Sequence, residues 1–200
     1  MLLIGISGKA NSGKNTVANN IISELGNGAK VIGRYRSVAF ADPIKDIVMK
    51  MFPLANEDEL WGASEMRAKI IPGSITNVNP DGLTYRKILC DLGALGRSYD
   101  ENIWVNVFEA NFKRHCNDRN DYTTYICSDV RFTNEFEILK SLGFYIVRII
   151  RDSYLKTDDI SETSQDSIPD SAFDKIVDNN GSLEFLKEQC TKIVLELQGK

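Results

Sequence analysis

The 200-residue chain has few of the residues and charges on which several classes of protein depend. Its single histidine, His115, lies in a polar stretch, which favours a solvated position at a helix end over a catalytic or metal-binding role. The net charge of −4 argues against general nucleic-acid binding, which needs a basic surface. The cysteines form no CxxC pair, so we expect reduced, mostly structural thiols. There are four of them: Cys90, Cys116, Cys127 and Cys190.

Long apolar runs are also missing. No run is long enough to span a membrane, and Met1–Ser7 is too short to be a signal peptide. These absences predict a cytosolic protein. The chain has neither a repeat nor a low-complexity linker, and 42% hydrophobic residues suffice for a core. We therefore expect a single domain over residues 1–200.

The most informative stretch of the chain is close to its start. Leu2–Ser7 is a predicted buried strand, a glycine loop follows, and a helix begins at Lys14. The frame G-x-x-x-x-G-K is typical of loops whose main-chain N–H groups surround phosphates, with the lysine serving the outer phosphates. We expect phosphate contacts from Gly8, Ala10, Asn11, Ser12, Gly13, Lys14, Asn15 and Thr16.

One position of this loop departs from the usual pattern. A serine or threonine normally follows the lysine, whereas here Asn15 follows it and Thr16 comes next. An amide is a poor replacement for a magnesium-binding hydroxyl, so Asn15 is only a minor candidate for a metal ligand. Thr16 can still donate to a phosphate.

Strands and helices alternate along the chain, which predicts an α/β fold with an open, mostly parallel five-stranded sheet. Ligands of such sheets lie beyond the carboxyl ends of the strands. Asp42, Asp129 and Arg151 follow three of these ends, so we expect them to meet the glycine loop in one crevice. The expected strands cover residues 2–7, 37–40 (with further strand material at 30–32), 123–127, 144–150 and 175–177.

Three of the candidates suit phosphoryl transfer, which needs positioned phosphates, a metal ion and positive charge. Asp129 is placed to order a hydrated magnesium ion, although it can also cap a helix or pair with Arg131. Arg131 can bind a phosphate bidentately or form a structural pair with Asp129 or Glu135, and both interpretations stay open. Arg151 ends an apolar strand and is the third phosphate candidate.

Residues 54–104 are the predicted substrate-binding region, and residues 152–172 a lid-like loop. Just before the first of these regions, Asp42 is a predicted helix N-cap. Asp42 and Lys45 are also candidates for contacts with the substrate that accepts the phosphoryl group.

A further predicted helix, Thr84–Gly96, carries Arg86, and Arg97 follows its end. Either arginine could clamp an acceptor phosphate. We prefer this role for Arg97 and a solvated helix face for Arg86.

Several segments together resemble the deoxynucleoside monophosphate kinases of tailed bacteriophages. They are GKANSGKNT, FADPIKD, LGALGRSYDENIW, SDVRFTNEFE, DISET and FDKIVDNNGSLEFL, which span residues 2–186. The resemblance implies a P-loop NTPase-type three-layer α/β/α fold. It also implies ATP and Mg²⁺ as cofactors, and phosphorylation of deoxynucleoside monophosphates to diphosphates. Small nucleotides would be the partners, with a homodimer left open, and the host cytoplasm would be the location of a phage-encoded chain.

The resemblance also implies roles for particular residues. Arg97, Trp104, Asp129 and Arg131 match segments that contribute to the acceptor and catalytic centre, with Lys14 acting on the transferred group. Ser161 and Glu162 would lie on the loop that closes over the nucleotides. This chain departs from the family pattern at Asn15, Ala94 and Ile160, where Asp, Thr and His are common.

Other functions remain open. A kinase of the same fold could use another small acceptor, as in dephospho-CoA-like or phosphomevalonate-like enzymes. A guanine-nucleotide switch should carry an N/T-K-x-D motif, which the chain lacks. Intact Gly8, Gly13, Lys14 and Asp129 argue against a catalytically idle homologue.

Overall fold

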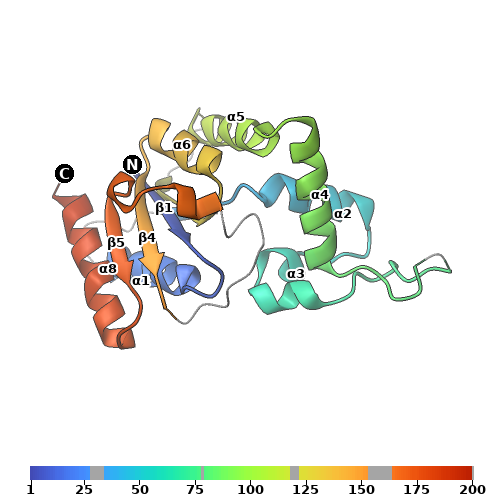
Figure 1. The fold of residues 1–200 in the computed structure, drawn as a ribbon, viewed down its shortest axis with the longest axis horizontal. Helices are drawn as coiled ribbons and strands as arrows, with labels where there is room; N and C mark the ends of the chain where they lie inside the picture. The colour runs from blue at the N-terminus through green and yellow to red at the C-terminus, as the bar shows by residue number, and fades with distance from the viewer. Residues whose placement is uncertain (28–33, 78, 118–121, 153–163, 200) are drawn as a thin grey trace. The chain divides into compact units, whose positions relative to one another are not determined.

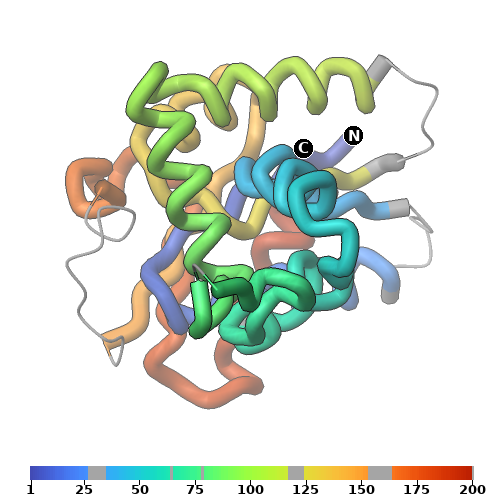
Figure 2. The backbone as a smooth tube through the Cα atoms, turned by 90° about the vertical axis from the view of Figure 1, so that its right-hand side faces the viewer, coloured from blue at the N-terminus to red at the C-terminus, as the bar shows by residue number. Residues whose placement is uncertain are grey.

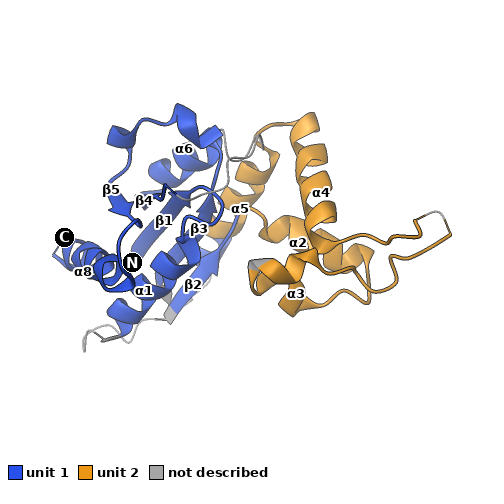
Figure 3. Cartoon of the chain, turned by 60° about the horizontal axis from the view of Figure 1, so that its bottom comes forward, with its two compact units in different colours: residues 1–39, 113–200 blue, residues 40–112 orange. Residues whose placement is uncertain are grey.

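A computed structural model describes residues 1–27, 34–77, 79–117, 122–152 and 164–199. The chain divides into two compact units (Figure 3). Unit 1 comprises residues 1–39 and 113–200, and unit 2 comprises residues 40–112. In the described part of the chain, no helix has the length and apolar character needed to cross a membrane.

Unit 1 is built on a five-stranded sheet with the order β2-β3-β1-β4-β5. All neighbouring strands are parallel, which confirms the predicted α/β fold. The expected strand material at 30–32 lies outside the described residues. The strands are β1 (Leu2–Gly8), β2 (Arg34–Val38), β3 (Tyr122–Val130), β4 (Tyr145–Ile150) and β5 (Lys175–Asp178).

Helices cover both faces of this sheet (Figure 1). On one face, Ile4 and Ile6 of β1 share a core cluster with α1 (Lys14–Asn27) and α8 (Leu183–Gln198). Successive strand residues point to opposite faces, so Gly5 faces the other layer. A Cβ atom on Gly5 would lie 3.4 Å from Leu139 of α6 (Thr133–Ser141). The central strand, which leads into the glycine loop, is therefore packed against helices on both faces.

Unit 2 is helical. It contains α2 (Asp42–Met51), α3 (Glu57–Trp61), a 3-10 turn η1 (Ser64–Ala68), α4 (Tyr85–Tyr99) and most of α5 (Ile103–Asn117). The last two helices meet at a sharp corner (Figure 2). One core cluster of unit 2 consists of Val48, Leu60, Ile71, Tyr85 and Ile88, which are all buried.

Candidate functional site

The glycine loop joins β1 to α1 through a tight turn in which Ser12 N donates to Lys9 O at 3.1 Å. Two of its residues are left-handed: Asn11 has φ 60° and Gly13 has φ 99°. Asparagine tolerates this region, whereas at Gly13 the backbone conformation disfavours any side chain. A Cβ atom there would also lie 2.4 Å from Asn179 Nδ2.

Two side chains that follow strand ends bind the main chain of the loop. Arg151 Nη1 donates to Asn11 O at 3.1 Å, and Asn179 Nδ2 donates to Ser12 O at 2.7 Å. Arg151 follows β4 and Asn179 follows β5, so both come from carboxyl ends of strands. Arg151 was predicted from the sequence as a phosphate contact, whereas Asn179 was not predicted. The strand-end rule, applied to β5, would have found Asn179.

The loop carries a cation and a buried hydroxyl. Lys14 Nζ donates to Gly8 O at 2.5 Å and to Lys9 O at 2.7 Å, which holds the ammonium over the loop. Ser12 is 1% exposed, and its Oγ has no hydrogen-bond partner among the described residues. Leaving a buried hydroxyl unpaired costs about 1–3 kcal/mol, so this atom is suited to a ligand. Asn15 and Thr16, the next residues of α1, are exposed.

A pocket of about 440 Å³ adjoins the loop. Its volume falls within the roughly 300–1,000 Å³ of small-molecule sites. Polar groups from the ends of β4 and β5 and from α1 meet there with leucines of α8. It is lined by Gly13, Thr16, Arg151, Asp152, Asn179, Asn180, Gly181, Leu183 and Leu186.

Asp129 lies inside β3, because the strand continues to Val130 rather than ending at Cys127 as predicted. Gly5 pairs with Cys127 but Ser7 pairs with Val130, so β3 carries one extra residue opposite this part of β1. Such bulges redirect side chains. The irregularity brings Asp129 beside the strand end from which the glycine loop starts.

Glu135 is a buried carboxyl next to this bulge. Its Oε2 accepts from Arg131 N at 2.7 Å and from Phe132 N at 3.1 Å, at the start of α6. Burial, followed by the nearby charge of Asp129, raises the pKa of Glu135 to about 8, although the two N–H groups and the charge of Arg131 oppose the shift. Glu135 therefore fixes the main chain that carries Arg131, a role that was not predicted from the sequence.

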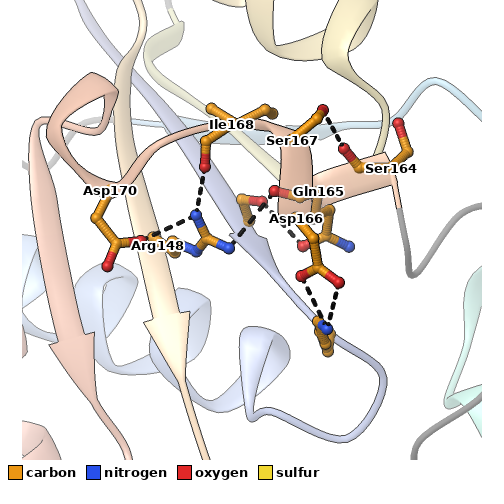
Figure 4. A network of polar contacts seen from close by, with 9 residues as sticks. Arg148, Ser164, Gln165, Asp166, Ser167, Ile168 and Asp170 are labelled. Atoms are coloured by element: carbon orange, nitrogen blue, oxygen red, sulfur yellow. Dashed lines mark hydrogen bonds and ion pairs between the residues drawn. The ribbon is translucent and has the colours of Figure 1, made fainter.

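The segment after residue 163 is tied to the base of the loop (Figure 4). Gln165, 2% exposed, accepts from Ser7 Oγ at 3.2 Å, and Asp166 forms an ion pair with Lys9 at 2.8 Å. Arg148 of β4 donates to Ile168 O at 2.8 Å. Within the predicted lid-like loop 152–172, residues 153–163 lie outside the described residues, and Glu162 with them. The closing role of this loop stays a prediction.

In unit 2, Asp42 is the first residue of α2, and its predicted N-cap role is wrong because Ala41 occupies that position. The Asp42 carboxylate is instead bound by side chains. Asp42 Oδ1 accepts from Lys45 Nζ at 2.9 Å and from Trp61 Nε1 at 3.0 Å. We call Asp42, Lys45 and Trp61 the Trp61 cluster; Trp61 was not among the predicted site residues.

Two glycines of α4 shape the surroundings of the other candidates in this unit. The Arg97 guanidinium lies 3.5 Å from the place of a Cβ atom on Gly93, so the missing side chain gives it room. Trp104 is 9% exposed, donates to Gly93 O at 3.0 Å and packs on Gly96. These contacts of Trp104 join α4 to α5. Arg86 is exposed in the first turn of α4.

No group of three or more His, Cys, Asp or Glu side chains suited to hold a metal ion occurs among the described residues. Of the predicted site residues in unit 1, Gly13, Thr16 and Arg151 line the pocket, whereas Lys14, Asp129 and Arg131 are not among its lining residues.

A parallel α/β sheet whose central strand leads through a glycine loop into the first helix is compatible with the P-loop NTPase class. The family model of deoxynucleotide monophosphate kinases matches residues 62–190. A curated protein of Acanthamoeba polyphaga mimivirus, named "Putative deoxynucleotide monophosphate kinase", is 30% identical over 206 residues, covering 97% of this chain and 96% of the relative. The chain belongs to the deoxynucleotide monophosphate kinase family, which confirms the resemblance found in the sequence.

Proposed function

We propose that the protein transfers the terminal phosphoryl group of ATP to deoxynucleoside 5′-monophosphates, forming ADP and the diphosphates. Membership of the kinase family supports the reaction class. The observation that carries the proposal is the buried hydroxyl of Ser12, which has no partner among the described residues, in the same loop as the Lys14 ammonium. Both groups suit a phosphate chain.

The donor occupies unit 1 in this proposal. Its phosphates bind the main chain and side chains of Gly8–Thr16, and its nucleoside occupies the adjoining 440 Å³ pocket. Arg151 then serves the donor, because its guanidinium contacts the loop and lines that pocket. Lys14 exchanges its two carbonyl partners for phosphate oxygens when ATP arrives.

The residues present fit a magnesium ion that keeps most of its water. Mg²⁺ is commonly held by one or two carboxylates, substrate phosphates and several waters, so the single carboxylate of Asp129 suffices. Asp129 would hold the hydrated ion, with the Asn15 amide oxygen as a further contact. The ion, when bound, neutralises charge on the donor phosphates.

The transfer itself follows from positioning and charge. An oxygen of the acceptor phosphate attacks the terminal phosphorus, the bond to the bridging oxygen breaks, and ADP leaves. Lys14 and Arg131 offset the charge on the transferred group, and Arg97 holds the acceptor phosphate. Asp42, Lys45, Arg86 and Trp104 remain proposed contacts of the acceptor, and Glu162 of the closed state.

A substrate panel tests the proposal. Purified protein is incubated with ATP, Mg²⁺ and each deoxynucleoside monophosphate, with ribonucleoside monophosphates, dephospho-CoA and phosphomevalonate as competing acceptors, and ADP formation is followed. We expect turnover of at least one deoxynucleoside monophosphate. Turnover of dephospho-CoA or phosphomevalonate alone would overturn the proposed acceptor while leaving the kinase assignment intact.

A further inference from the structure

Trp61 combines an exposed ring with a fixed orientation. It ends the short helix α3 and is 41% exposed, whereas the second tryptophan, Trp104, is 9% exposed. The indole N–H of Trp61 donates to Asp42 Oδ1 at 3.0 Å, across 19 positions of sequence. An exposed tryptophan that only covers a surface does not need such a bond.

Lys45 fixes the ring further. Its ammonium lies 5.3 Å from the centroid of the Trp61 ring and 2.9 Å from the same carboxylate oxygen, and the residue is only 7% exposed. A lysine so deeply placed is held by its partners rather than by water. The ring therefore has a cation over its face and a carboxylate at its polar edge, and these contacts restrict its motion.

The helix α3 does not need Trp61 for anchoring. Its neighbour Leu60 is fully buried in the core of unit 2, and Asn56 N donates to the hydroxyl of buried Tyr85 at 2.9 Å. Arg67 also binds the end of the helix, because its Nε donates to Leu60 O at 3.1 Å. The exposed indole is thus available for a ligand, with the guanidinium of Arg67 adding positive charge close by.

We propose that Trp61 is the surface on which the base of the acceptor nucleotide stacks, with Asp42 and Lys45 as the residues that position its ring. The inference rests on the proposed function and names a binding residue for its acceptor. Any of the bases can stack on an aromatic ring, and a ring that is already ordered loses little conformational freedom when a base binds. The acceptor is preferred over the donor because the glycine loop and the pocket belong to unit 1, whereas the Trp61 cluster belongs wholly to unit 2.

Intrinsic fluorescence tests the contact without turnover. The parent protein and Trp61→Phe are titrated with dGMP, dAMP, dCMP and dTMP in the absence of ATP. We expect a saturable quench in the parent with at least one of them, and a clearly smaller response in Trp61→Phe, where Trp104, itself a proposed acceptor contact, is the remaining emitter. An equal quench in both proteins, or no quench in the parent by any of the four, overturns the inference.

Steady-state kinetics gives the second readout. We expect Trp61→Leu, which lacks a ring, to raise KM for the monophosphate about tenfold, and Trp61→Phe to raise it less than about threefold. KM for ATP and kcat should change by less than about twofold in both, as should every parameter of the control Tyr99→Leu, which removes an exposed aromatic ring of the same unit.

The two readouts separate the inference from the proposed function. Unchanged acceptor KM in Trp61→Leu, or an equal rise of KM for ATP, overturns the base-stacking role while monophosphate turnover preserves the function. Quenching specific to Trp61 in a protein that turns over no monophosphate supports the binding contact and overturns the proposed reaction.

Discussion

The glycine loop and the Trp61 cluster are two proposed sites built by different means. The loop is a run of consecutive residues whose proposed binding groups are mostly main-chain amides, and its shape depends on left-handed φ at Asn11 and Gly13. The Trp61 cluster consists of side chains from two helices, joined across 19 positions of sequence. A site of the first kind depends on local backbone freedom, whereas one of the second kind depends on how helices pack.

This difference explains what could be predicted. The loop and the parallel sheet were predicted correctly because glycine spacing and apolar runs are local patterns. The end of β3 was misplaced because its bulge depends on pairing with β1, which no local pattern shows. Trp61 was not singled out as a site residue and Asn179 was missed, because their hydrogen-bond partners are distant in sequence. Glu135 was seen only as a partner of Arg131, since its burial depends on tertiary packing.

The largest expected effect tests whether the loop needs its side-chain charge. We expect Lys14→Ala to lower kcat by about a hundredfold or more, because a cation at the transferred group has no main-chain substitute. The thermal midpoint should stay near that of the parent. Lys9→Ala is the matched control, since the Lys9 ammonium pairs with Asp166. Near-normal turnover in Lys14→Ala would show that the main-chain groups of the loop are sufficient for phosphoryl transfer without the lysine charge.

Gly13→Ala tests whether the loop is defined by its backbone. The substitution places a Cβ atom at φ 99° and 2.4 Å from Asn179 Nδ2, so we expect a loss of about 1–3 kcal/mol in the free energy of unfolding and an increase of roughly tenfold in KM for ATP. Urea unfolding and steady-state kinetics measure the two effects.

The control is Gly26→Ala, where a Cβ atom would meet nothing within 4 Å in the helix α1. Adding Asn179→Ala to Gly13→Ala removes the contact but not the backbone strain, and should restore only part of the stability. Full recovery in the double variant would assign the whole effect to packing, and would make the loop resemble the Trp61 cluster.

The buried carboxyl of Glu135 predicts how the stability of the protein depends on pH. Its pKa is about 4.5 as a free side chain and about 8 in the folded protein, so between these values the folded protein binds one more proton than the unfolded chain. The contribution of Glu135 to stability is therefore complete below pH 4.5 and is lost as pH rises to 8, by roughly 1.4 kcal/mol per pH unit. Urea unfolding at pH 5, 6.5 and 8 should show this slope in the parent and not in Glu135→Gln. Glu137→Gln, exposed on the same helix, should retain the slope of the parent.

The smallest expected effect concerns Asn15, the residue that departs from the usual loop pattern. Asn15 is exposed at the start of α1, and in the proposed site the hydrated metal is held through Asp129. We therefore expect Asn15→Ala to change kcat and KM for ATP by less than about threefold, because one exposed amide contact contributes little. Thr16→Ala, which removes a side chain that lines the pocket, should raise KM for ATP more than Asn15→Ala does. A loss of several hundredfold in Asn15→Ala would make its amide a direct participant. The loop would then depend, like the Trp61 cluster, on a particular side chain, and its glycine frame would be insufficient to define the site.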